Sequence, residues 1–235
     1  KTDLGPSLRR DFLDETLILS DIVFGKIKSD YLKILKNRNK VLKNIFEKNT
    51  TKRELIFWDN AFIEISLKYY DFRKRFIIFI EENIKIIEDM LKNKYKLKFI
   101  YETKVDLDNI SNSISNYLEK NLDRDILLGY TYIGPHLDNF YFNVIIGNKS
   151  YKAENYLSHG ENKSILIGLK FLQIAFIQQY NKTDIILLLD DIFSELDKDH
   201  IILVMEKCNN YQSFITVQNI PNFLDNNDKI KTINL

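Results

Sequence analysis

A run of five consecutive apolar residues, Ile185–Leu189, constrains the fold more than any other feature of this sequence. A strand with one face in water alternates apolar and polar side chains, so a run without alternation is typical of a strand covered on both faces. Such strands belong to parallel sheets of the α/β class. Asp190 and Asp191 follow the run directly. Because parallel strands deliver their carboxyl ends to the ligand crevice of an open sheet, the pattern predicts a ligand site there.

The two carboxylates suit metal-assisted phosphate chemistry. A carboxylate at the end of such a strand can hold Mg²⁺ directly or through water, which makes Asp190 the candidate metal ligand. The next carboxylate, Asp191, is placed to orient or deprotonate an attacking water. An apolar strand followed by two aspartates is also common where no catalysis occurs. The pattern alone leaves both interpretations open.

The region from Ser29 to about Lys94 shows helical periodicity instead. It fits either a projecting helical arm or a helical subdomain that packs its own core. Because three heptads barely make a coiled coil, the subdomain is favoured. The first apolar stripe, interrupted by Arg38, contains Tyr31, Ile34, Leu35, Val41, Leu42 and Ile45, and the second, with heptad spacing, contains Trp58, Phe62, Ile65, Tyr69, Phe72 and Phe76.

The period changes again at Leu97, where short apolar segments bounded by Gly, Pro and Asn predict strands. Gly147-Asn148 indicates the turn of a hairpin. A helix that is apolar almost all round is predicted over Lys163–Gln179. The other predicted strands are Leu97–Tyr101, Ile126–Tyr132, Phe140–Ile146, Ser213–Val217 and Lys229–Leu235.

Composition excludes several classes of protein. The 235 residues are 45% hydrophobic, which is typical of a globular chain of one or two domains. With 34 basic and 33 acidic residues, any contact with nucleic acid requires a local patch. The single cysteine, Cys208, excludes a disulfide framework and favours a reducing, cytoplasmic setting. No apolar run approaches the roughly 18 residues of a membrane span, so no membrane association is expected.

A second motif, Leu157 to Glu161, stands directly before the apolar helix. Ser158 can donate a hydroxyl, Gly160 lets backbone N–H groups approach a ligand closely, and a helix N-terminus attracts anionic phosphate. The same residues also fit an ordinary helix start, with Ser158 as N-cap and Glu161 completing a capping box. By itself the segment favours the capping interpretation.

The order of the motifs reverses that preference. Ser158-His159-Gly160-Glu161, then Asp190-Asp191, then Ser194-Glu195-Leu196-Asp197 resemble the signature, the Walker B motif and the following loop of ABC-type ATPases. The chain resembles the RecF family in particular, and this resemblance covers nearly all of it. Further matching segments are Gly134-Pro135-His136, the stretch Pro6 to Asp14, the stretch Tyr31 to Leu42, Trp58-Asp59 and Arg73.

The resemblance implies an α/β fold, namely part of an ABC-type ATPase head with an inserted α-helical lobe. Residues 1–25 would be a remnant of the head, 26–125 the helical lobe, and 126–235 the head with the signature and Walker B motifs. Ser158, His159, Gly160, Glu161, Ser194 and Asp197 would contact ATP across a homodimer, with Asp190 on Mg²⁺ and Asp191 on water.

The intact protein would then be a weak DNA-dependent ATPase of recombinational repair, replication restart and the SOS response. It would clamp double-stranded DNA, favouring gap junctions between single and double strands, and would act with RecR, RecO and RecA. Gly134 and Pro135 fit a strand-ending turn better than a binding element.

The chain departs from the family pattern at several positions. His159 replaces the usual glutamine, and Leu137 and Asn139 stand where arginine and aspartate are usual. The chain begins at Lys1 and contains no Gly-x-x-x-x-Gly-Lys-Ser/Thr loop, which the resemblance would place upstream, so this chain alone is expected not to hydrolyse ATP. The switch residue could be Thr216 or Gln218. Another ABC or SMC-like ATPase, and a non-catalytic binding module with the same fold, remain alternatives.

Overall fold

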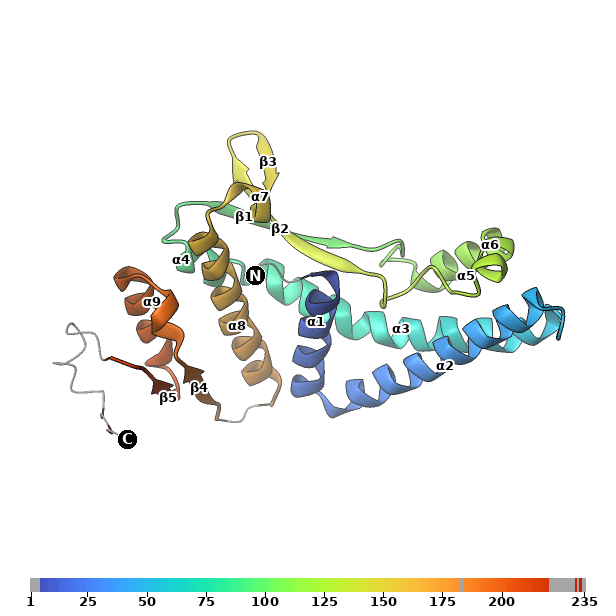
Figure 1. Ribbon diagram of the computed structural model, residues 1–235, viewed down its shortest axis with the longest axis horizontal. Coiled ribbons are helices and arrows are strands. Elements are labelled where there is room, and N and C mark those ends of the chain that lie inside the picture. Colours follow the sequence, from blue (N-terminus) through green and yellow to red (C-terminus); the bar gives the residue numbers. More distant parts are fainter. Residues whose placement is uncertain (1–4, 182–183, 220–230, 232, 234–235) are drawn as a thin grey trace. The chain divides into compact units, whose positions relative to one another are not determined.

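The computed structural model describes residues 5–181, 184–219, 231 and 233 (Figure 1). The chain divides into two compact units, residues 1–182 and 183–235. The predicted strand Lys229–Leu235 lies almost wholly outside the described residues. The proposed lobe boundaries at 26–125 do not coincide with this division and stay a prediction. Among the described residues, no helix is both long and apolar enough to cross a membrane.

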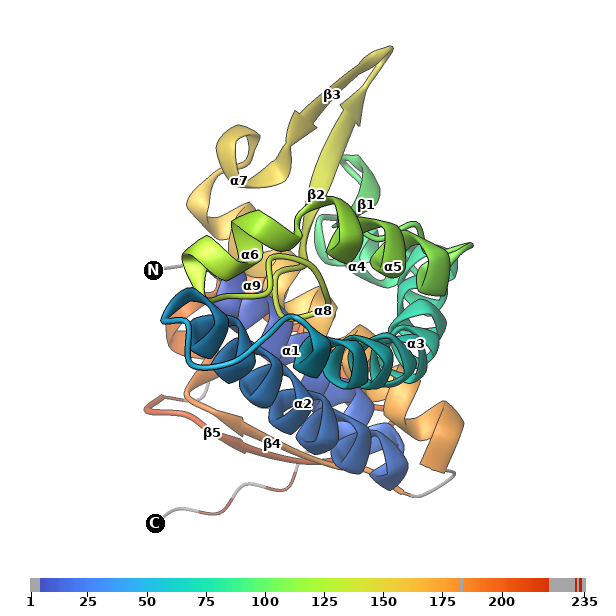
Figure 2. The same ribbon diagram turned by 90° about the vertical axis from the view of Figure 1, so that its right-hand side faces the viewer.

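The first unit is built on a pair of long helices. Helix α1 spans Pro6–Ser20, α2 spans Ile22–Phe46 and α3 spans Arg53–Glu82. Figure 2 shows α2 and α3 side by side, and α6 (Leu122–Leu128) packs against α2 while α5 (Ile110–Lys120) packs against α3. The predicted helical region is therefore confirmed, with breaks between α2 and α3 and before the short helix α4 (Lys85–Met90).

A three-stranded antiparallel sheet adjoins the helices. Its order is β1-β2-β3, with β1 at Lys96–Glu102, β2 at Asn139–Ile146 and β3 at Lys149–Lys152. Phe99 pairs with Phe142 across β1 and β2. The hairpin between β2 and β3 is confirmed, and Gly147 takes a positive φ of 56° in its turn.

The predicted strand Ile126–Tyr132 is wrong. Helix α6 extends to Leu128 and ends at Gly129, which adopts the left-handed conformation with φ 61°. Ile126 packs against the small cluster of Val41, Leu42 and Leu55. A short apolar run fits a buried helical turn as well as a strand, and here packing against α2 decides for the helix.

One short helix and one long helix complete the first unit. After α7 (Ala153–Tyr156), helix α8 spans His159–Asn181, which confirms the predicted apolar helix and extends it by four residues at its start. Helix α8 packs against α4 and α1. Its buried residues include Ile165, Leu169 and Phe176, which belong to the main core.

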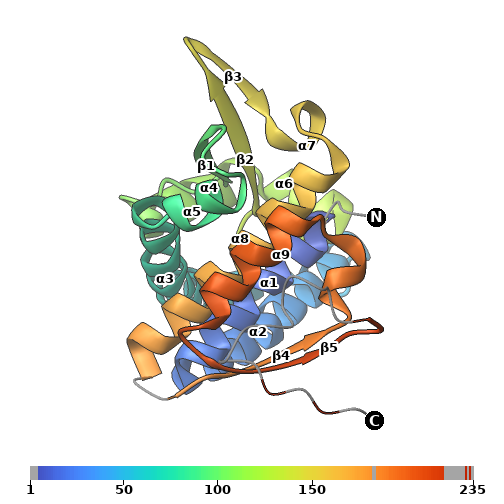
Figure 3. The ribbon, with the colours of Figure 1, turned by 90° about the vertical axis from the view of Figure 1, so that its left-hand side faces the viewer.

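The second unit contains a pair of parallel strands, β4 at Ile186–Asp190 and β5 at Gln212–Thr216 (Figure 3). A 3-10 turn at Ile192–Glu195 and helix α9 at Lys198–Cys208 connect them. The parallel pairing is confirmed. The predicted burial of β4 on both faces is wrong. Leu187 is 6% exposed, but Leu188 is 77% and Ile186 is 55% exposed. The described residues therefore cover one face of this pair only.

Candidate functional site

The predicted signature residues lie at the start of α8, where Ser158 closes a capping box. The Ser158 hydroxyl and its backbone N–H both donate to Glu161 Oε2, each at 2.9 Å. The Glu161 N–H donates back to Ser158 Oγ at 3.3 Å. Ser158, His159 and Gly160 are exposed on this turn. The segment therefore forms a capping box, and the side chains of the predicted signature remain accessible at the surface.

The other carboxylate oxygen of Glu161 is held from a distant segment. Lys94 Nζ donates to Oε1 at 2.9 Å, and the Tyr95 hydroxyl donates to it at 3.0 Å. Burial alone would raise the pKa of Glu161, but the bonds from Lys94, Ser158 and Tyr95 outweigh it and lower that pKa to about 2. Glu161 thus stays ionised and braces the loop. No sequence signal pointed to Lys94 or Tyr95.

Glycine at position 160 is not required by the fold of this chain. A Cβ added there would meet nothing within 4 Å. Gly168, two turns along the same helix, is different, because a Cβ there would lie 2.8 Å from Ile87 Cα on α4. Packing explains Gly168, whereas at Gly160 the missing side chain keeps the outer surface open.

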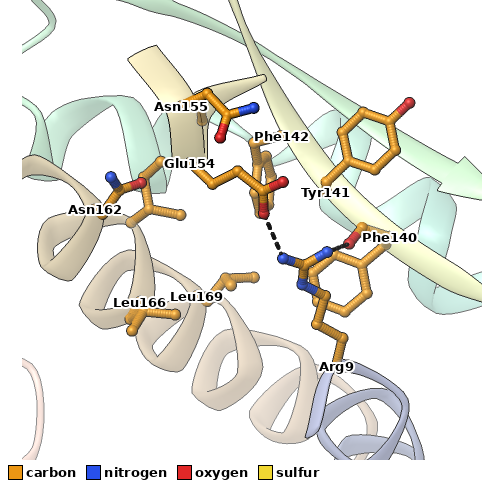
Figure 4. Close-up of a pocket in the computed structure, with 11 residues that line it drawn as sticks. Arg9, Phe140, Tyr141, Phe142, Glu154, Asn155, Asn162, Leu166 and Leu169 are labelled. Atoms are coloured by element: carbon orange, nitrogen blue, oxygen red, sulfur yellow. Dashed lines mark hydrogen bonds and ion pairs between the residues drawn. The ribbon is translucent and has the colours of Figure 1, made fainter. Parts of the chain in front are cut away.

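A cavity of about 230 Å³ adjoins this loop, between α1, β2, α7 and α8 (Figure 4). Arg9 reaches across its floor, donating to Glu154 Oε2 at 2.7 Å and to the Phe140 carbonyl at 3.1 Å. Asn162 and Leu166 line the α8 side. Glu154 lies on α7, which leads directly into Leu157 and Ser158, so Arg9 ties the base of the signature loop to α1 and β2. The Pro6 to Asp14 resemblance contained Arg9 but assigned it no role.

The predicted Walker B pair lies in the second unit, at the carboxyl ends of β4 and β5. Asp190 is exposed and accepts a 2.6 Å hydrogen bond from the Thr216 hydroxyl. The Asp191 N–H donates to Thr216 Oγ1 at 3.1 Å and to the Thr216 carbonyl at 3.1 Å. Gln218 Nε2 donates to Asp191 Oδ2 at 3.4 Å. Both candidates for the switch residue therefore contact the pair, Thr216 more closely.

Asp191 also has an unusual backbone. Its φ of 45° and ψ of 31° are left-handed, a conformation that costs most side chains about 1–2 kcal/mol and that aspartate tolerates better than most. The conformation turns the chain sharply at the end of β4.

Residues 194–197 follow that turn. Asp197 is the N-cap of α9 and accepts from the His200 N–H at 2.9 Å and from His200 Nδ1 at 2.8 Å. The side chains of Ser194 and Glu195 lie outside the described residues. Asp197 therefore has a structural role in this chain, as Ser158 does.

The carboxylate pair fits Mg²⁺ bound together with a phosphate ligand. Among the described residues, no group of three His, Cys, Asp or Glu side chains could hold a metal by itself. Mg²⁺ in phosphate-transfer sites uses one or two carboxylates, with waters and substrate oxygens filling its other positions. Asp190, exposed at a strand end, matches that requirement.

The Gly-Pro-His element is a buried corner. Gly134 has φ 120°, and a Cβ there would lie 2.6 Å from the Tyr31 hydroxyl. His136 Nδ1 contacts that hydroxyl at 2.5 Å and Nε2 contacts the Thr131 carbonyl at 3.1 Å. Burial lowers the pKa of His136 to about 4, so the ring is neutral at pH 7. This supports the interpretation of the element as a turn.

Two other matching residues, Arg38 and Arg73, are fully buried. Arg38 donates to Asp59 at 2.7 Å, to Asp125 at 3.1 Å and to Thr131 at 2.7 Å. Arg73 donates to Asp14. The contacts with Asp59 on α3 and Asp125 on α6 explain why Arg38 interrupts an apolar stripe, because they link α2 to both helices from inside.

The parallel strands with terminal carboxylates, the exposed helix start and the helical hairpin define part of an ABC-type ATPase head with an inserted α-helical lobe. No family model matches the chain. It is 32% identical over 233 residues to the DNA replication and repair protein RecF of Ruminiclostridium cellulolyticum. The aligned region covers 93% of this chain and 60% of the relative. It is 34% identical over 220 residues to RecF of Streptococcus gordonii, covering 90% and 58%.

A solved structure agrees with the sequence comparison. The recombination mediator protein RecF with ATP, from the RecFOR pathway, superimposes with a TM-score of 0.81 at 26% identity, covering 94% of this chain and 60% of that one. The chain belongs to the RecF family. It spans about three fifths of the length of the relatives it matches.

Proposed function

We propose that the intact protein is an ATP-dependent DNA-binding protein of recombinational repair, acting as RecF does. The observation that carries the proposal is the Asp190-Asp191 pair at the carboxyl ends of two parallel strands, with Asp190 exposed and Asp191 half-buried, both contacted by Thr216 or Gln218. The solved RecF relative contains ATP by its title, and this chain supplies the residue types that such a ligand needs.

In the proposed mechanism two subunits sandwich ATP. The P-loop of one subunit, upstream of this chain, faces Ser158, His159 and Gly160 of the other. The helix N-terminus and the Ser158 hydroxyl stabilise the terminal phosphate, because unpaired N–H groups and a positive dipole end favour an anion. The open surface at Gly160 lets the partner approach.

Hydrolysis is assigned to the second unit. Asp190 would hold Mg²⁺ directly or through water, and the ion would supply charge neutralisation for the phosphates. Asp191 orients the attacking water, with Gln218 beside it. Ser194 and Asp197 contact the nucleotide from the loop that follows. Closure of the dimer clamps DNA, and hydrolysis releases it.

The setting is proposed on the same basis. DNA at junctions between single and double strands is the substrate, RecR, RecO and RecA are the partners, and the cytoplasm is the location.

Glu161 differs from the other signature residues, because its carboxylate is held by Lys94, Tyr95 and Ser158. It braces the loop rather than contacting nucleotide.

The test uses the full-length protein with its own P-loop segment. General-base help is worth roughly 10²–10⁴-fold in rate, so Asp191→Asn should lower ATP turnover by about that factor and accumulate the ATP-bound dimer. Asp190→Asn should raise the Mg²⁺ concentration needed for turnover. Glu206→Gln, an exposed carboxylate on α9, is the matched control. Turnover by both aspartate variants at the wild-type rate would contradict the assignment.

A further inference from the structure

A cluster of cations and tyrosines lies away from the nucleotide motifs, around the loop that follows α6. We call it the tyrosine-cation surface. It is centred on the loop that leads from α6 toward β2 (Figure 1). Its members are Arg10 on α1, Lys104 after β1, Tyr117 on α5, Arg124 on α6, and Tyr130 and Tyr132 in the loop.

Two of the cations share one ring. Lys104 Nζ lies 3.8 Å and the Arg124 guanidinium 4.6 Å from the centre of the Tyr132 ring. Lys104 is also 5.7 Å from the Tyr117 ring and donates to the Tyr132 carbonyl at 3.3 Å. Burial lowers the pKa of Lys104 and the neighbouring Arg124 charge lowers it further. The fold therefore holds two like charges together.

One carboxylate relieves this repulsion in part, because the charge of Asp125 opposes the lowering of the Lys104 pKa by burial and by Arg124. Asp125, next to Arg124 in the sequence, is fully buried and bonded to Arg38 at 3.1 Å. Within the part of the chain that the structure describes, Arg10, Lys104 and Arg124 make no ion pair with a carboxylate. Arg10 donates to the Asp138 carbonyl at 3.2 Å, and its charge opposes the rise that burial causes in the pKa of Tyr130. Three cations thus lie around the loop with no direct ion pair among the described residues, and the nearby carboxylate of Asp125 is itself bonded to Arg38.

The rings beside them face solvent. Tyr130 and Tyr132 are each 36% exposed and meet edge to face, with centroids 6.3 Å apart and an interplanar angle of 68°. Tyr130 meets His136 in the same way, at 5.7 Å. No ring of the described residues stacks parallel on Tyr130. An aromatic face flanked by cations suits a nucleic-acid strand, whose phosphates pair with the cations and whose unpaired bases stack.

We propose that the tyrosine-cation surface binds single-stranded DNA, with Arg10, Lys104 and Arg124 on phosphates and Tyr130 stacking on a base. Single strands are favoured over duplex because duplex bases are already stacked on each other and cannot reach an aromatic side chain. An acidic polypeptide would engage the cations but would not use the exposed rings. The choice of DNA over RNA rests on the proposed function, whereas the surface itself does not.

The experiment measures fluorescence anisotropy of labelled oligothymidine with this 235-residue chain, without nucleotide, over a series of salt concentrations. Tyr130→Ala should weaken binding roughly 5- to 150-fold, the range for losing one stacked base. Lys104→Gln and Arg124→Gln should each lower the slope of log affinity against log salt by about 0.7. Lys68→Gln, an exposed lysine on α3, should leave the slope unchanged.

Melting curves of each variant separate lost binding from lost folding. Failure of the wild-type chain to bind at low salt would overturn the proposal, and so would wild-type affinity in folded Tyr130, Lys104 and Arg124 variants. Tighter binding to blunt duplex, or equal competition by polyglutamate, would also overturn it. Because the assay contains no ATP, failure of ATP-driven dimerisation would leave its result unchanged. Conversely, if the tyrosine-cation surface does not bind DNA, the ATP-turnover experiment with Asp191→Asn remains a valid test of the proposed function.

Discussion

The residues that link this chain to RecF fall into two regions with opposite surroundings. Arg38, Arg73 and His136 lie inside the first unit, where their hydrogen bonds end on other residues of the same chain. Ser158 and Asp190 are exposed, at a helix start and a strand end. The first group holds elements together, and the second presents polar groups outward.

This comparison shows that a match to a family motif does not tell whether the matched residue stabilises the fold or takes part in function. Gly-Pro-His and the signature segment are both short and both characteristic of the family. Burial separates them: His136 is enclosed by Tyr31 and Thr131, whereas Gly160 faces open space. Substitutions in the buried group should therefore act on folding and substitutions in the exposed group on assembly.

The largest expected effect is at Arg38. Arg38→Met would leave the buried Asp125 without its charged partner, and breaking a buried ion pair costs about 3–5 kcal/mol. Chemical denaturation of the chain should show that loss in the free energy of unfolding. Arg75→Met, an exposed arginine on α3, should change it by no more than about 0.5 kcal/mol. Equal effects of the two substitutions would remove the distinction between buried and exposed residues.

The next effect depends on pH and tests the buried corner. The pKa of His136 is about 4 when folded, against about 6.5 when unfolded, so the unfolded state binds more protons between these values. Stability should fall as pH drops from about 6.5 to about 4, by about 3 kcal/mol in total, and this group should have no effect above that window.

Melting at closely spaced pH values measures the loss. His136→Asn should flatten the slope between pH 6.5 and 5, whereas His159→Asn, at the exposed signature, should not. A steep slope that persists in His136→Asn would assign the pH dependence to other groups.

The smallest expected effect on stability comes from alanine substitutions at two glycines of α8. Gly168→Ala places a methyl group 2.8 Å from Ile87 Cα and should cost about 1–3 kcal/mol. Gly160→Ala meets nothing within 4 Å and should stabilise the chain by up to about 1 kcal/mol. In the full-length protein Gly160→Ala should nevertheless weaken ATP-driven dimerisation, as measured by sizing with ATP. A Gly160→Ala protein that dimerises normally would leave glycine at 160 unexplained.

The sequence by itself determined the family, the parallel strand pair and the long helices. Local patterns carry this information: heptad spacing marks α3, an unbroken apolar run marks β4, and turn residues mark the hairpin after β2. These signals fail where a short apolar run fits two structures, as at Ile126, where packing on α2 selects a helix. Periodicity cannot distinguish such cases over seven residues.

Only the tertiary structure decided which motif residues are buried and which cations of the described residues make no ion pair. Arg38 and Arg124 look alike in the sequence, yet Arg38 reaches Asp59 and Asp125 inside the fold while Arg124 lies over Tyr132 at the surface. Lys94 reaches Glu161 across 67 residues of sequence. Burial and charge pairing depend on which distant segments meet, and that is set by the packing of whole helices rather than by neighbours in the chain.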